Sequence, residues 1–154
     1  MEGLRVLANR KTTKVTFVGV PDQPGMAADI LGALGRRGIN VEMVVSTGGQ
    51  DGTADISIAI TRNQTHGIVE ALEAIRRDAG ARALHSNAEA ALISLLGPGL
   101  QTEPGIAGRM FGAISRAGVN IEAISTSVSS VTCMIEDARC ETALAALRLE
   151  FNLE

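Results

Sequence analysis

The sequence predicts an α+β protein made of two βαββαβ units, each an antiparallel four-stranded sheet with two helices on one face. The first observation is a repeat. The segment from Pro24-Gly25 to Gly38-Ile39-Asn40-Val41-Glu42 returns 80 residues later, from Pro104-Gly105 to Gly118-Val119-Asn120-Ile121-Glu122. The second is that strand-like and helix-like spacings of apolar residues follow the same order in both copies. A repeat of this length indicates two copies of one supersecondary unit.

The first copy contains all six elements of such a unit. A β-branched strand ends in the dense turn residues 21–25, and a helix stripe then runs to Gly38, a typical helix-ending residue. Two strands joined by the glycine-rich loop 48–52 follow, and a second helix stripe stops near Gly80. The expected strands are 14–20, 41–47, 56–60 and 82–86, and the helix stripes are Ala27, Ile30, Leu31 and Leu34, then Ile68, Val69, Leu72 and Ile75.

The second copy lacks a fourth strand after its last helix. Its expected strands are 92–97, 120–127 and 130–136, and its helix stripes are Ala107, Met110, Phe111 and Ile114, then Leu144, Leu147 and Phe151. A sheet one strand short would leave an open edge, and the strand-like segment 4–8 is still unassigned. We therefore expect the first domain, 11–90, to be inserted in a second domain formed by 1–10 plus 91–154.

Composition narrows the function classes. The net charge is −3, and the chain has three Phe and no Tyr or Trp, which disfavours a nucleic-acid surface. The sequence shows neither a membrane-spanning apolar run nor a secretory signal, so we expect a cytoplasmic protein. Cys133 alternates with apolar residues and is interpreted as a buried hydrophobe. His66 and His85 are isolated, and each is expected to be exposed to solvent or locally hydrogen-bonded. No metal and no cofactor are expected.

The turn before the first helix is the most promising binding feature. The N–H groups of Gly25, Met26 and Ala27 would have no acceptors within the helix, which suits a carboxylate, and Asp22 could pair with an ammonium group. Together they fit a free α-amino acid. The alternative is that Asp22 only bonds its own turn. The second copy has Thr102-Glu103 in place of Asp22-Gln23, in a turn two residues longer, so the two turns are not equivalent.

Motifs for catalysis are missing from the sequence. Gly25 is followed by Met26 rather than by the Lys-Ser or Lys-Thr of a phosphate-binding loop, and no Ser or Cys nucleophile has a His nearby. An enzyme with ferredoxin-like chemistry is therefore the least favoured interpretation.

Three segments carry a resemblance to a known family. They are Lys14-Val15-Thr16-Phe17-Val18-Gly19-Val20-Pro21-Asp22-Gln23-Pro24-Gly25, then Gly38-Ile39-Asn40-Val41-Glu42-Met43-Val44, and Gly118 to Ser127. Together they resemble the tandem ACT domains of bacterial aspartate kinase, over about 4–151. The kinase domain of that enzyme is absent from this sequence, so the chain resembles a separate regulatory (β) subunit or that region of the enzyme.

The resemblance implies an allosteric module that binds threonine, lysine or both and controls an aspartate kinase catalytic subunit or domain. It also implies a homodimer in which the first ACT unit of one chain lies beside the second unit of the other. Two segments depart from the family pattern, Ser46 and Val128-Ser129-Ser130. The alternative is a free-standing ACT sensor that regulates another enzyme or a transcription factor. The implied effector-binding residues are Asp22, Gly25, Met26 and Ala27, with Ser46 beside them, and Asn120 and Ile121 from the second unit.

Overall fold

The structure, a computed structural model, describes residues 3–49, 51–61 and 67–154. These residues form two compact units. The first unit is Lys11–Ala88, and the second combines the residues up to Arg10 with Glu89–Glu154. Two long strands, β1 and β4, each contribute residues to both units. Among the described residues, none of the helices has the length and apolar content needed to cross a bilayer.

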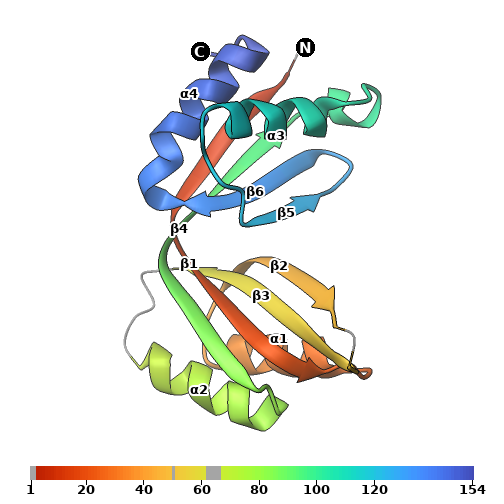
Figure 1. Cartoon of the computed structure of the whole chain (residues 1–154), viewed down its shortest axis with the longest axis vertical. Coiled ribbons are helices and arrows are strands. Elements are labelled where there is room, and N and C mark those ends of the chain that lie inside the picture. The colour runs from red at the N-terminus through yellow and green to blue at the C-terminus, as the bar shows by residue number, and fades with distance from the viewer. Residues whose placement is uncertain (1–2, 50, 62–66) are drawn as a thin grey trace. The chain divides into compact units, whose positions relative to one another are not determined.

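The first unit is a four-stranded sheet with the strand order β2-β3-β1-β4. Strand β3 pairs antiparallel with both of its neighbours, so Ile58 lies between Val15 on β1 and Val44 on β2. Figure 1 shows helices α1 and α2 on one face of this sheet. The elements are β1 (Arg5–Pro21), α1 (Met26–Arg36), β2 (Val41–Gly48), β3 (Thr53–Thr61), α2 (Ile68–Ala79) and β4 (Ala83–Leu96).

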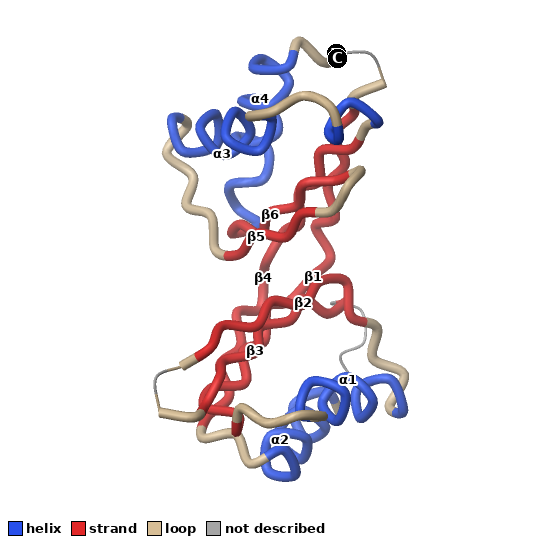
Figure 2. Tube along the Cα trace, turned by 90° about the vertical axis from the view of Figure 1, so that its right-hand side faces the viewer, coloured by secondary structure: helices blue, strands red, loops and turns tan. Residues whose placement is uncertain are grey.

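The second unit repeats this arrangement with the strand order β1-β4-β6-β5. Strand β6 pairs antiparallel with β4 and β5, and helices α3 and α4 cover one face of the sheet (Figure 2). Its further elements are the short 3-10 helix η1 (Pro98–Gln101), α3 (Ile106–Arg116), β5 (Ala123–Thr126), β6 (Ser130–Glu136), the 3-10 helix η2 (Asp137–Arg139) and α4 (Cys140–Phe151).

Each unit has its own hydrophobic core between sheet and helices. Fully buried side chains of the first core include Phe17, Ile30, Leu34, Ile58 and Ile75, and those of the second include Leu95, Met110, Ile114, Ile135 and Leu147. Burying one such side chain stabilises the fold by roughly 1.5–3 kcal/mol. Leu4 is buried in the second core and Val6 packs against it, so the N-terminal segment contributes apolar surface to this unit.

The predicted fold class is confirmed, and α1 begins at Met26 as its turn predicts. Three strand predictions need correction. The segments 4–8 and 14–20 belong to the single strand β1, and 82–86 and 92–97 both belong to β4. Thr12, which lies between the two predicted segments, is buried and pairs with Thr61 on β3. The strand predicted at 120–127 is only Ala123–Thr126, because its ladder with β6 starts at Ala123.

Candidate functional site

The turn between β1 and α1 is held by backbone hydrogen bonds. The Asp22 N–H donates to the Gly52 carbonyl of the β2–β3 hairpin at 2.9 Å, and the Gln23 N–H donates to the Pro21 carbonyl at 3.0 Å. Gly25 then enters the helix with a φ of +93°, a left-handed conformation that favours glycine. No side chain caps this helix. Its first turn is therefore exposed at a fixed position on the unit.

The first turn of α1 leaves backbone donors free. Among the residues that the structure describes, the N–H groups of Gly25 and Ala27 meet no protein acceptor. The Met26 N–H donates to the Gln23 carbonyl at 3.4 Å, a long hydrogen bond. The first regular helical bond runs from the Asp29 N–H to the Gly25 carbonyl at 2.9 Å. Unpaired N–H groups at the positive end of a helix dipole favour an anion.

The Asp22 side chain is exposed beside these donors. Within the described part of the chain its carboxylate accepts no hydrogen bond and forms no ion pair, so the alternative of a self-bonded Asp turn is not observed. The turn is closed by backbone groups instead. A carboxylate that is not needed for the turn remains available for a ligand.

Ser46 lies on β2, the outermost strand of the first sheet. It pairs with Ile56, whose side chain is in the core, so Ser46 points toward the helix-covered face at its exposed rim. Ala54 lies opposite both Gly48 on β2 and Val20 on β1. Ser46 is therefore close to the end of the sheet from which the Asp22 turn leaves.

Asn120 and Ile121 belong to the second unit and precede β5 rather than lying within it. Asn120 is exposed and Ile121 is half-buried. The next residue, Glu122, donates its N–H to the Met134 carbonyl at 2.8 Å, which fixes the segment against β6. The predicted site residues thus fall into a group of five in the first unit and a pair in the second.

The corresponding entrance of α3 is built differently. Gly105 has a φ of +88°, like Gly25, but the longer turn contains η1. Thr102, at the position of Asp22, donates through its hydroxyl to the Gly99 carbonyl at 3.4 Å. Ile106 is buried, whereas the equivalent Met26 is half-buried. This entrance has no free carboxylate at the Asp22 position.

The cysteine and histidine residues that the structure describes lie on other elements than this turn. Cys133 and Cys140 are buried, and burial raises the pKa of the Cys133 thiol to about 12, so it is a poor nucleophile. His66 lies outside the described residues. His85 is exposed and, with Lys14, Thr16 and Asp55, lines a hollow of about 390 Å³ that the sequence did not reveal.

Sequence profiles of the ACT domain match residues 14–80 and 93–151. An aspartate kinase of Stutzerimonas stutzeri (strain A1501) is 36% identical over 146 residues, 95% of this chain and 35% of the enzyme. The crystal structure of aspartokinase alpha and beta subunits matches with a TM-score of 0.87 at 30% identity, covering 96% of this chain and 97% of the matched one.

A second solved structure is similar along its whole length. The ligand-free regulatory subunit of aspartate kinase from Thermus thermophilus matches with a TM-score of 0.85 at 29% identity, covering 95% of this chain and 96% of the subunit. In contrast, the chain spans about a third of the length of the aspartate kinases that it matches in sequence, 35% for the Stutzerimonas enzyme.

Proposed function

This chain belongs to the ACT-domain family as a regulatory region of aspartate kinase, and from this premise we propose that it is a feedback sensor for an end-product amino acid. The region represented here is the regulatory one and carries no kinase active site. The proposed effector is threonine or lysine, the proposed partner is an aspartate kinase catalytic subunit or domain, and the proposed location is the cytoplasm. The free Asp22 carboxylate beside unpaired helix N–H groups is the observation that supports the proposal.

The effector would be held by both of its charges. Its carboxylate would accept hydrogen bonds from the N–H groups of Gly25 and Ala27, and its ammonium group would bind Asp22. Each hydrogen bond to a charged group contributes roughly 1.5–3 kcal/mol, so three of them support micromolar to millimolar binding. Met26 and Ser46 would lie near the effector side chain. The short Ser46 hydroxyl favours a small polar side chain over a long one.

Asn120 and Ile121 would complete the site from a second chain. In both units the outermost strand presents an exposed apolar residue at the equivalent position: Val44 on β2 is 39% exposed and Ile124 on β5 is 45% exposed. An unpaired strand edge with apolar side chains favours association with another chain. A homodimer in which β2 of one chain lies along β5 of the other would add Asn120 and Ile121 to the first unit's turn.

Regulation would follow from a difference in affinity. An effector that binds one arrangement of the dimer more tightly shifts the attached catalytic domain toward the state that this arrangement favours. The shift cannot exceed the ratio of the two affinities, and coupling of this kind typically changes an equilibrium by about 5–150-fold.

Calorimetric titration tests the proposal. Threonine or lysine should bind, methionine should not, and Asp22→Ala should weaken binding by about 10-fold or more, the loss of one charged hydrogen-bond partner. Glu103→Ala, at the corresponding turn of the second unit, is the matched control and should keep full affinity. Unchanged affinity in Asp22→Ala would refute the assigned ammonium contact, and no binding of either amino acid would refute the sensor function.

A further inference from the structure

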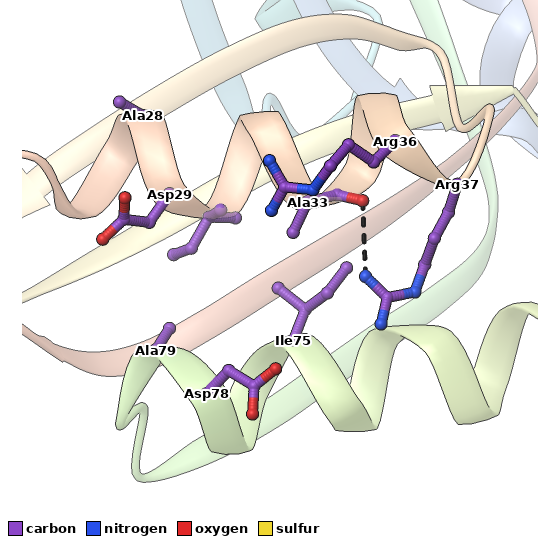
Figure 3. A pocket seen from close by; sticks show the side chains of 9 residues that line it. Ala28, Asp29, Ala33, Arg36, Arg37, Ile75, Asp78 and Ala79 are labelled. Carbon is purple, nitrogen blue, oxygen red and sulfur yellow. Dashed lines mark hydrogen bonds between the residues drawn. The ribbon is translucent and has the colours of Figure 1, made fainter.

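A groove of about 460 Å³ lies between α1 and α2 on the first unit (Figure 3). Figure 3 shows Asp29 at one end of the groove and Arg37 at the other, with Asp78 and the guanidinium group of Arg36 between them. All four side chains are exposed, and within the described residues none of them forms an ion pair. The charge along the groove therefore changes from acidic at the Asp29 end to basic at the Arg37 end.

The corresponding place in the second unit is filled by side chains of its own two helices. In the repeat, Arg109 takes the position of Asp29 and Arg116 that of Arg36. The penultimate residue of α4 is Glu150, where α2 has Asp78. Arg109 Nε lies 3.1 Å from Glu150 Oε1, and Arg116 Nη2 lies 3.2 Å from Glu150 Oε2. The Arg109 guanidinium also lies over the ring of Phe151, 4.6 Å from its centre.

The first unit lacks two of these internal partners, Arg109 and Phe151, although Arg36 keeps the position of Arg116. Asp29 replaces the arginine that faces the acid, and Ala79 replaces the phenylalanine that fills the space. Asp78 is also at the C-terminal end of α2, where a negative charge opposes the helix dipole. Two carboxylates thus face a hollow in which the second unit holds a guanidinium group. A guanidinium group from another molecule would take the position that Arg109 occupies in the second unit.

The basic end of the groove identifies the source of this cation. Two copies of the groove that face each other in antiparallel orientation place the acidic end of each against the basic end of the other. A two-fold axis through the middle of the groove gives this orientation, so the groove is complementary to a second copy of itself. We propose that this groove is a contact between two copies of the chain, in which Arg36 and Arg37 of each copy meet Asp78 and Asp29 of the other.

This contact uses the helix layer, whereas the dimer proposed above uses strand edges. It therefore predicts an assembly larger than that dimer and does not depend on amino-acid binding. Because the pairs are exposed, added salt should weaken the contact. Asp29→Arg alone should copy the Arg109–Glu150 pair within one chain and so block the contact without unfolding the unit.

Sedimentation equilibrium of two complementary variants tests the contact. Asp29→Arg with Asp78→Arg makes the groove basic throughout, and Arg36→Glu with Arg37→Glu makes it acidic throughout. Each variant alone should associate about tenfold more weakly than the wild type, whereas an equal mixture should recover the wild-type association. Recovery in the mixture also demonstrates that both variants are folded.

A matched control and the amino-acid titration separate this contact from the sensor. Glu103→Arg changes an exposed acid in the second unit and should associate like the wild type. All variants should keep the wild-type affinity for the amino acid, since Asp22 and Asn120 are unchanged. Equal masses for the wild type and both variants at every concentration, or a mixture no larger than its components, would overturn the proposal. Either result would leave the sensor function standing.

Discussion

Arg10 binds Asp137 through its side chain, with 3.0 Å between Arg10 Nε and Asp137 Oδ1. A second nitrogen of the same guanidinium, Nη1, lies 3.0 Å from Glu141 Oε1. Hydrogen bonding to Asp137 is the main reason that the pKa of Arg10 is raised. One arginine thus joins β1 to η2 and to the first turn of α4, more than 120 residues later in the chain.

Arg10→Met should destabilise the second unit. It removes the contacts to Asp137 and Glu141 but keeps the apolar stem of the side chain, so the loss reports on charge and hydrogen bonding. We expect the Tm of the chain to fall by about 2–4 °C in low salt. Arg5→Met is the matched control, because Arg5 is exposed on the same strand and forms no ion pair among the described residues. An equal effect of both substitutions would argue against a specific role for Arg10.

Deletion of residues 1–10 tests the proposed domain boundary. The deletion removes Leu4 and Val6 from the core of the second unit as well as the Arg10 contacts. The second unit should lose its cooperative unfolding transition while the first keeps its own. Hydrogen exchange followed by mass spectrometry would show this as loss of protection in α3 and α4 but not in α1 and α2. Unchanged protection of α3 and α4 would contradict the boundary at residue 10.

A mixing experiment tests whether two chains share one effector site. Asp22→Ala and Asn120→Ala should each weaken amino-acid binding, because each removes one half of the proposed site. In a dimer formed from one chain of each kind, one site carries both substitutions and the other carries neither. After subunit exchange, about one site in four should therefore bind with wild-type affinity. Calorimetry that finds no high-affinity sites in the mixture would place both halves of the site in one chain.

The sequence was sufficient for the features that depend on local pattern. The repeat and its turn residues predicted two βαββαβ units and the start of α1 at Met26, as the structure has them. Strand continuity was not predictable, because Thr12 is held in β1 by its position opposite Thr61, far away in the sequence. It was equally unpredictable that the Asp22 carboxylate is free, since the turn is closed by the Gly52 carbonyl of the β2–β3 hairpin.

The groove between α1 and α2 could not be found from either helix alone. The groove is open because the first unit has Ala79 where the second has Phe151, and Asp29 where the second has Arg109. Helical spacing predicts which residues of one helix share a face, but not which residue of another helix lies opposite them. The repeat aligns these positions in the sequence, but only the contacts in the second unit show that Arg109 and Phe151 lie together.

Two glycine substitutions, one just before α1 and one within it, should have opposite effects on stability. Gly25→Ala forces a side chain into the left-handed region, with φ at +93°, and should destabilise the unit by about 1–2 kcal/mol. Gly35→Ala lies within the helix, and no heavy atom comes within 4 Å of the new Cβ. It should stabilise the unit by about 0.5–1 kcal/mol. Urea denaturation measures both, and stabilisation by Gly25→Ala would mean that the turn does not need its left-handed residue.

Stability should fall steeply in alkaline solution because of Cys133. Burial raises the pKa of its thiol from 9.0 to about 12. Between these values the unfolded chain has released the proton and the folded chain still holds it, so rising pH favours unfolding. A single group of this kind lowers the free energy of unfolding by up to about 1.4 kcal/mol per pH unit. Urea denaturation between about pH 8 and pH 10.5 measures this slope.

Cys133→Ala separates this effect from the titration of lysine side chains. The smaller residue leaves a cavity in a fully buried position, so the variant should be less stable than the wild type near neutral pH. Its stability should nevertheless decline less with pH, because no buried thiol remains at this position to be ionised. The two stability curves should therefore approach each other as the pH rises. Parallel curves would show that the Cys133 thiol does not contribute to alkaline unfolding.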